Sequence, residues 1–316
     1  MLDEKSAADV FESLAKPIQR TLTKLGFTHP TLPQTMAIPA VLSGKNVLLI
    51  APTGSGKTEA VLLPVFSKLI EQPDQKGITV IYITPLRALN RDMLKRLTFW
   101  NEQLGITIEV RHGDTDMKIR RRQARQPPQM LVTTPETLQA ILPGTLMRKH
   151  LKNVKTVIVD EVHELAESKR GTQLTIALER LREITDTEFQ RIGLSATVGN
   201  PDDVAKFIAG TNRPITLVQA ALAKNFRYHI ENPQPTATDF ELAAKLETSP
   251  EAAARIRRLT ELVDTHKSTL IFVNSRQNAE MLGHKLSLLN RNDIAVHHGS
   301  LSREERANTE DDFKNP

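Results

Sequence analysis

A glycine-rich turn at residues 51–58, A-P-T-G-S-G-K-T, has the residue types that point most directly to chemistry. It follows an apolar run at residues 47–50 and opens a stretch with helical periodicity, so it lies where a strand passes into a helix. Gly54 and Gly56 permit turns closed to other residues and let backbone N–H groups approach an anion. The pattern predicts a phosphate-binding P-loop, with Ala51 in place of the usual first glycine.

The side chains of this loop suit a triphosphate and a magnesium ion. Lys57 supplies a positive charge for the β and γ phosphates, and the Thr58 hydroxyl can ligate Mg²⁺. An incidental lysine in a glycine-rich turn is the alternative interpretation, and the strand before and helix after the turn disfavour it. The residues predicted to hold the nucleotide from this loop are Thr53, Gly54, Ser55, Gly56, Lys57 and Thr58.

Two adjacent carboxylates, Asp160 and Glu161, follow the apolar run 157–159. The carboxyl ends of parallel strands are where α/β proteins bind ligands. Asp160 is predicted to hold Mg²⁺, directly or through water, and Glu161 to orient and deprotonate an attacking water. Acidic residues after a strand are also common as helix N-terminal charges, but their pairing with a P-loop favours catalysis.

Short runs rich in Val and Ile alternate with helical patterns between residues 46 and 209, which predicts a parallel sheet with helices on both faces. The fold class is therefore a doubly wound α/β domain. Strands are predicted at residues 47–51, 79–83, 107–110, 130–133, 156–160 and 191–195. Helices are predicted at residues 58–70, 86–103, 118–125, 136–142, 172–182 and 201–208.

The pattern changes after residues 210–214, and residues 231–236 contain two prolines, which interrupt regular structure. We therefore predict two domains, residues 1–214 and residues 215–316. In the second domain, helices are predicted at 250–266, 276–289 and 303–313, strands at 269–273 and 294–297, and weaker strands at 215–218 and 226–230. These strands are too few for a sheet as large as the first.

The composition excludes several classes of protein. The 316 residues suffice for two cores, and the net charge of +5 is too mild to identify a polyanionic partner. The absence of cysteine excludes disulfides and thiolate metal sites. The N-terminus lacks a signal-peptide pattern, and no apolar run approaches the ~20 residues that span a bilayer. We expect a cytoplasmic protein without membrane contact.

The motif at residues 160–163, D-E-V-H, resembles the D-E-x-H box of superfamily 2 helicases, and further motifs follow in that family's order. The resemblance implies two RecA-like lobes and ATP hydrolysis coupled to movement on nucleic acid. Gln34 resembles the glutamine of the Q motif, which reads the adenine edge and selects ATP. Ser195 and Thr197 resemble motif III, which together with His163 couples the nucleotide site to the nucleic-acid groove.

Four other segments resemble the family's nucleic-acid motifs, namely residues 84–90 (motif Ia), 133–136 (motif Ib), 271–276 (motif IV) and 297–302. Their hydroxyls, guanidinium groups and helix starts suit contacts with phosphates. For the first two segments, a capped helix start is the alternative interpretation. The resemblance implies nucleic-acid contacts by Pro85, Arg87, Thr134, Pro135, Asn274, Arg276 and Gly299.

Residues 112–115, 160–171 and 194–201 are most similar to the Lhr-like branch of the superfamily. That branch is usually a DNA-dependent ATPase that translocates 3′ to 5′ on single strands. Single-stranded DNA is therefore the favoured partner, with RNA or a DNA–RNA hybrid as alternatives, and the protein is expected to act as a monomer. A DEAD-box RNA remodeller is disfavoured because residue 163 is histidine.

Complete members of the superfamily continue into a Gly-Arg-rich motif VI, and no Q-x-x-G-R-x-G-R-like string occurs in this sequence. We expect a chain that ends before its second lobe is complete. An arginine finger is worth about 10³ to 10⁵ in turnover, so impaired hydrolysis is expected. A nonhydrolysing, nucleotide-dependent binding module is the competing interpretation.

A basic segment at residues 118–125 contains four arginines and one lysine. It could add salt-sensitive contacts with phosphates, or it could be the solvated face of a helix. The sequence does not favour either interpretation.

Overall fold

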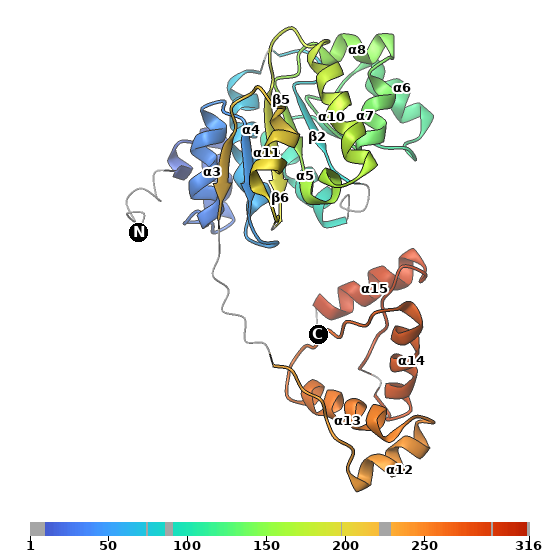
Figure 1. Ribbon diagram of the computed structural model, residues 1–316. Coiled ribbons are helices and arrows are strands. Elements are labelled where there is room, and N and C mark those ends of the chain that lie inside the picture. Colours follow the sequence, from blue (N-terminus) through green and yellow to red (C-terminus); the bar gives the residue numbers. More distant parts are fainter. Residues whose placement is uncertain are drawn as a thin grey trace. The chain divides into compact units, whose positions relative to one another are not determined.

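The computed structural model describes residues 10–73, 75–85, 91–196, 198–220, 229–291 and 293–314. The chain forms two compact units, Met1–Lys224 and Asn225–Pro316 (Figure 1). Among the described residues, no helix combines the length and the apolar character needed to cross a membrane.

The first unit is built on a seven-stranded sheet with the strand order β3-β4-β2-β5-β6-β1-β7, in which every pair is parallel. Five of the strands are buried along their whole length, as expected for a parallel sheet covered on both faces. The strands are β1 (Val47–Ile50), β2 (Val80–Ile83), β3 (Ile108–Arg111), β4 (Met130–Thr133), β5 (Thr156–Val159), β6 (Gln190–Ser195) and β7 (Thr216–Gln219).

Helices pack on both faces of this sheet, and each face has its own apolar cluster. Along β2, Val80 and Tyr82 face the first cluster and Ile81 and Ile83 the second, because successive strand residues point to opposite faces. In Figure 1, α3 and α4 lie on one side of β2 and β5, and α7 and α10 on the other. The helices are α2 (Lys16–Lys24), α3 (Leu32–Leu42), α4 (Lys57–Glu71), α5 (Arg91–Leu104), α6 (Met117–Arg125), α7 (Pro135–Ile141), α8 (Thr145–Leu151), α9 (Val162–Ala166), α10 (Lys169–Arg182) and α11 (Pro201–Ala209).

These elements confirm the predicted RecA-like α/β fold, and the six predicted strands agree with β1 to β6 to within a residue or so at each end. Among the helices whose bounds the structure describes in the first unit, four were not predicted: α2, α3, α8 and α9. Helix α3 contains Pro33 and Pro39, which weaken a helical pattern. Pro33 lies in the first turn, where proline removes no hydrogen bond that the helix would make.

The boundary between the units lies later along the chain than predicted. Strand β7 pairs with β1, with Val47 opposite Thr216, so residues 216–219 complete the first sheet. The predicted boundary at residue 214 is therefore too early, and the weak strand predicted at 215–218 for the second domain belongs to the first. The preceding segment is also tied to the first unit, because Arg213 forms two hydrogen bonds of 2.9 Å with the carboxylate of Glu179 on α10.

The second unit consists of α12 (Ala237–Lys245), α13 (Pro250–Asp264), α14 (Arg276–Ser287) and α15 (Arg303–Lys314), and its buried apolar cluster is small. No strand is formed at 269–273 or 294–297, where the sequence predicted two. Leu270 is 63% exposed and Phe272 87% exposed. A strand requires a neighbour for its backbone N–H and C=O groups, and no described segment of this unit supplies one.

Candidate nucleotide-binding and coupling site

The predicted P-loop is a turn between β1 and α4. Gly54 and Gly56 adopt positive φ angles of 76° and 83°, which favour glycine. A Cβ atom on Gly56 would also lie only 2.8 Å from Nε2 of Gln34, so the Gln34 side chain would have to shift, and the positive φ angle is what requires glycine there. Ser55 closes the turn by donating from Oγ to the carbonyl oxygen of Pro52 at 2.7 Å.

Lys57 is the first residue of α4 and is only 6% exposed. Its Nζ atom has no hydrogen-bond partner among the described residues, and Glu161 Oε2 lies 4.0 Å away. A buried ammonium group without hydrogen bonds is costly, so this position suits an anionic ligand that would supply them. The P-loop lysine and the acidic pair, which are far apart in sequence, thus meet at the carboxyl edge of the sheet.

Asp160 follows β5 and is buried. Its Oδ1 accepts a hydrogen bond from the Glu161 N–H at 2.9 Å, and its Oδ2 accepts one from the Tyr82 hydroxyl at 2.5 Å. Burial raises the pKa of the Asp160 carboxyl, and the bond from Tyr82 acts in the opposite direction. Sequence reasoning missed Tyr82, and the available signal was a tyrosine in the otherwise aliphatic run V-I-Y-I.

Glu161 has φ 49° and ψ 46°, a left-handed conformation that is unusual for a residue other than glycine. Such strained residues cluster at functional sites. Burial, and after it the neighbouring Asp160 charge, raise the pKa of the Glu161 carboxyl. A raised pKa makes this carboxylate a better proton acceptor, which is what a general base requires.

His163 connects the acidic segment to the end of β6. Its Nδ1 accepts a hydrogen bond from the Ala196 N–H at 3.3 Å, and Ser195 Oγ lies 3.3 Å from the same nitrogen. The structure thus brings together two of the three predicted coupling residues, and the third, Thr197, lies outside the described residues.

Gln34 lies against the P-loop. Its Nε2 donates to the Gly56 carbonyl oxygen at 3.5 Å, and its Oε1 accepts from the Thr31 N–H at 2.9 Å as part of a capping box at the start of α3. The amide group therefore ties α3 to the P-loop. Its predicted contact with adenine stays a prediction.

The predicted nucleic-acid residues of the first unit are only partly described. Thr134 is buried, and its hydroxyl caps α7 by accepting from the Thr137 N–H at 3.3 Å, with Pro135 as the first helical residue. This geometry corresponds to the capped helix start that was the alternative interpretation. Pro85 is described, whereas Arg87 lies outside the described residues.

In the second unit, the structure brings together two of the three predicted residues. Arg276 donates from Nη1 to Ser300 Oγ at 2.7 Å, and a Cβ atom on Gly299 would lie 3.7 Å from its Nη2. Asn274 is exposed just before α14. The two segments that resemble family motifs therefore meet through Arg276.

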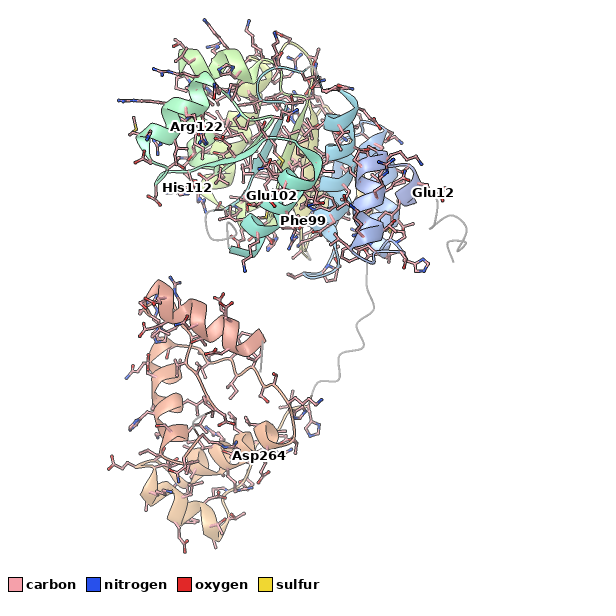
Figure 2. The ribbon with its side chains drawn as sticks, turned by 180° about the vertical axis from the view of Figure 1, so that it is seen from behind. Glu12, Phe99, Glu102, His112, Arg122 and Asp264 are labelled. Atoms are coloured by element: carbon pink, nitrogen blue, oxygen red, sulfur yellow. The ribbon has the colours of Figure 1, made fainter. Side chains whose placement is uncertain are left out.

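The basic segment on α6 divides into bound and exposed side chains. Arg120 donates to the carbonyl oxygens of His112, Gly113 and Thr115, so it holds the loop after β3. Arg122 pairs with Glu109 at 2.9 Å, and Figure 2 shows Arg122 and His112 at the same end of the unit. These two arginines have intramolecular partners. The exposed side chains of this segment are those of Lys118, Arg121, Arg125 and also Arg122, which keeps its ion pair at the surface.

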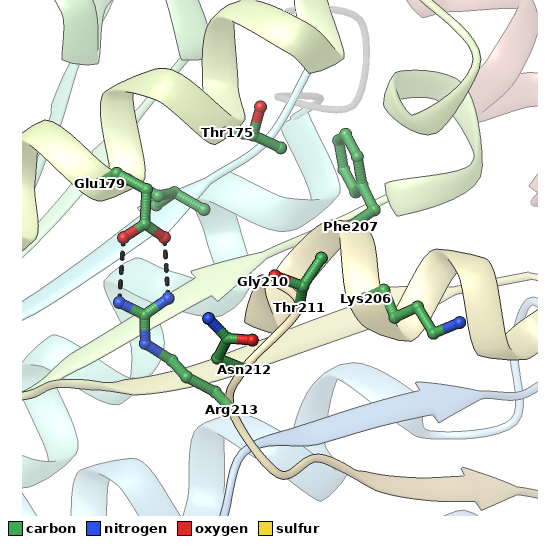
Figure 3. A pocket seen from close by; sticks show the side chains of 9 residues that line it. Thr175, Glu179, Lys206, Phe207, Gly210, Thr211, Asn212 and Arg213 are labelled. Atoms are coloured by element: carbon green, nitrogen blue, oxygen red, sulfur yellow. Dashed lines mark hydrogen bonds and ion pairs between the residues drawn. The ribbon is translucent and has the colours of Figure 1, made fainter.

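A separate surface pocket of about 560 Å³ lies between α10 and α11 and includes none of the predicted site residues. Figure 3 shows the carboxylate of Glu179 and the guanidinium of Arg213 joined by two hydrogen bonds beside it. These bonds anchor the segment that leads into β7, so we assign this region to the scaffold.

Comparison with known proteins agrees with the arrangement of these motifs. Residues 31–204 match the DEAD/DEAH box helicase family, and residues 254–316 match the helicase conserved C-terminal domain. The ATP-dependent helicase Lhr-Core of Methanocaldococcus jannaschii is 36% identical over 98% of this chain and 38% of its own length. The Lhr helicase/uracil glycosylase of Escherichia coli K12 is 31% identical over 99% of this chain and 24% of its own length.

The chain thus spans less than two fifths of the length of these two relatives. Among solved structures, the Mycobacterium smegmatis helicase Lhr bound to single-stranded DNA and AMP-PNP is 38% identical with a TM-score of 0.75, covering 98% of this chain and 41% of that chain. The DEAD-box helicase Mss116, at 21% identity and a TM-score of 0.70, has a similar fold. This chain belongs to the DEAD/DEAH box helicase family and, within it, to the Lhr-like helicases of superfamily 2.

Proposed function

We propose that the chain binds and hydrolyses ATP as part of a motor that moves 3′ to 5′ on single-stranded DNA. The observation that carries this proposal is the meeting of the P-loop with the acidic pair. In the described part of the chain, the buried Nζ of Lys57 has no hydrogen-bond partner, and it lies 4.0 Å from Glu161 Oε2. A triphosphate with Mg²⁺ would supply the missing partners and compensate the clustered charges.

In the proposed ATP hydrolysis, each residue of the site has its own role. Lys57 and the backbone N–H groups of residues 54–58 bind the β and γ phosphates, and Thr58 and Asp160 hold Mg²⁺. When bound, Mg²⁺ neutralises charge on the phosphates. Glu161 orients the attacking water and accepts its proton on a carboxylate oxygen. His163, bonded to the Ala196 amide, transmits the state of this site to the segment after β6.

The nucleic-acid partner is proposed from the relatives and from the predicted motifs. The M. smegmatis Lhr structure contains single-stranded DNA, which favours DNA over RNA or a DNA–RNA hybrid. In the first unit, the Thr134 hydroxyl is already used in a helix cap. We therefore propose that Pro85 and the backbone around Pro135 contact the single-stranded DNA. Asn274, Arg276 and Gly299 are the proposed contacts of the second unit, and we propose that the protein acts as a monomer.

A second candidate is a binding module that takes up ATP without hydrolysing it. The observation that favours it is the absence of a Q-x-x-G-R-x-G-R-like string from these 316 residues. Without arginines that stabilise the transferring phosphoryl group, binding can persist while turnover is lost.

Measuring ATP hydrolysis by the full chain, with single-stranded DNA or RNA added, tests the proposal. We expect stimulation by DNA, and a loss of about 10²-fold or more for Glu161→Gln, since general bases contribute that much. Glu167→Gln, an exposed glutamate beyond α9, is the matched control and should match the wild type.

Three results would contradict the proposal in different ways. Stimulation by RNA alone removes the DNA preference. Nucleotide binding without any turnover selects the second candidate. Turnover that is unaffected by Glu161→Gln removes the assigned base.

A further inference from the structure

The hydroxyl of Tyr82 is buried within the first unit and touches one of the proposed magnesium ligands. Tyr82 lies in β2, is 0% exposed, and donates to Asp160 Oδ2 at 2.5 Å. This length is typical of a hydroxyl bonded to a carboxylate, which is stronger than a bond between neutral groups. A buried phenol needs a partner for its O–H group, and here that partner is the carboxylate at the nucleotide site.

The sheet register explains why Tyr82 reaches this carboxylate. Tyr82 lies opposite Ile158 in the parallel pair β2–β5, and Asp160 is two residues beyond Ile158 on the same face. The long phenol ring spans this diagonal, which is within the reach of aromatic side chains. Phenylalanine would fill the same space without donating to Asp160.

The second oxygen of Asp160 is also held, by the N–H of Glu161 at 2.9 Å. The two bonds fix the plane of the carboxylate, and the second one involves the backbone of a residue in the strained left-handed conformation. Each carboxylate oxygen keeps a further lone pair for water or a metal ion. Tyr82, Asp160 and Glu161 thus form a continuous chain of hydrogen bonds.

We propose that Tyr82 is a positioning residue for the Asp160 carboxylate, orienting it toward Mg²⁺ and supporting the backbone of Glu161. The inference rests on the proposed function, because it takes Asp160 as a magnesium ligand. Tyr82 touches neither the metal nor the nucleotide in this role. Its removal therefore affects the metal-dependent part of nucleotide binding and leaves the metal-independent part unchanged.

A binding experiment on the full chain separates these two parts. The affinity for a fluorescent AMP-PNP analogue is measured in EDTA and then across a Mg²⁺ titration. For Tyr82→Phe we expect unchanged affinity in EDTA and a Mg²⁺ midpoint raised on the order of 10-fold or more, as for other groups that orient metal ligands. Tyr228→Phe alters the other of the two tyrosines in the sequence and should leave both values unchanged.

An unchanged Mg²⁺ midpoint in a folded Tyr82→Phe variant overturns the inference. An equal loss of affinity in EDTA and in Mg²⁺ also overturns it, because a purely structural role would act that way. Wild-type protein that binds no nucleotide overturns both the inference and the proposed function. Binding that depends on Lys57 but shows no effect of Tyr82 overturns the inference alone.

Fluorine NMR gives a second measurement that leaves Tyr82 in place, should the phenylalanine variant not fold. The sequence contains two tyrosines, so 3-fluorotyrosine labelling yields two signals, and the Tyr228→Phe variant assigns them. We expect the Tyr82 signal to shift when Mg²⁺ is added to protein saturated with AMP-PNP in EDTA. A Tyr82 signal that stays in place while Mg²⁺ strengthens nucleotide binding overturns the inference.

Discussion

The two units of the chain satisfy their backbone and bury their apolar residues in different ways. In the first unit, seven parallel strands pair along the sheet, and apolar clusters cover both of its faces. In the described part of the second unit, the regular structure is helical, and the buried cluster centres on Leu246, Ile256 and Leu286. Phe272, 87% exposed, lies in a segment that pairs with no other strand among the described residues.

This difference bears on function because the proposed chemistry is divided between the units. Lys57, Asp160 and Glu161 follow or adjoin paired strands, so a rigid scaffold holds them. Asn274 and Gly299 lie in a unit whose described residues form no sheet. We therefore expect the nucleotide site to be preorganised, and the nucleic-acid residues of the second unit to gain order from additional contacts.

The largest expected effect is a contrast in amide hydrogen exchange between the units. Core strand amides exchange through global opening, which typically costs about 5 to 15 kcal/mol, whereas unpaired segments exchange at a free energy near zero. Mass spectrometry of the intact chain should show strong protection in β6 and little in residues 269–273. Similar protection in both segments would contradict the contrast.

A pair of phenylalanine substitutions compares the core of the first unit with an exposed segment of the second. Phe66 is 0% exposed in the first cluster, and Phe66→Ala should lower the free energy of unfolding of the first unit by about 3 to 5 kcal/mol. Phe272→Ala is the matched control and should change stability by less than about 0.5 kcal/mol. Denaturant unfolding measures both, and equal losses would show that residues 269–273 are packed.

Gly171 tests the packing between α10 and α9. A Cβ atom at this position on α10 would lie 2.0 Å from the carbonyl oxygen of Leu165 on α9, the helix that carries His163. Gly171→Ala should therefore destabilise the first unit by about 1 to 3 kcal/mol. Gly113→Ala, where a Cβ meets no atom within 4 Å, is the control. Thermal unfolding that is the same for both variants would disprove this close approach.

The smallest effect concerns acid sensitivity of the second unit. The hydrogen bond from Arg257 on α13, and after it the backbone bond from Thr236, lower the pKa of Asp239 from 3.8 to about 2. A lowered pKa in the folded state gives stability that is present above pH 3.8 and is lost as the pH falls toward 2.

The helicity of α12 and α13, followed by NMR, should decline over this range in the wild type. The Asp239→Asn variant lacks the titrating carboxyl, and its helicity should depend less on pH in this window. An identical pH profile for the two proteins would show that Asp239 does not contribute.

Most strands and helices of the first unit could be predicted from local sequence patterns. The valine and isoleucine runs located β1 to β6, and the order of the motifs identified the P-loop and the acidic pair, which the structure brings together. Tyr82 could not be predicted because its role depends on the register between β2 and β5, a contact between residues far apart in sequence. The packing of Gln34 against Gly56 has the same origin.

The strands predicted in the second unit had a suitable local pattern. A strand is stabilised by its neighbours, however, and residues 269–273 have none among the described residues. Conversely, residues 215–218 gave only a weak strand pattern, and pairing with β1 made β7 part of the first sheet. In both cases, pairing with distant segments decided the outcome.

The most direct test of the account is the affinity of the full chain for Mg·AMP-PNP, measured by calorimetry for the wild type and for Lys57→Ala. Lys155→Ala removes an exposed lysine just before β5, at the opposite end of the strand from Asp160, and is the matched control. Since hydrogen bonds to charged groups are worth about 1.5 to 3 kcal/mol, Lys57→Ala should weaken binding on the order of 10- to 100-fold, with the control unchanged. Equal affinities for the wild type and Lys57→Ala would contradict the claim that the P-loop and the acidic pair hold one magnesium–nucleotide complex.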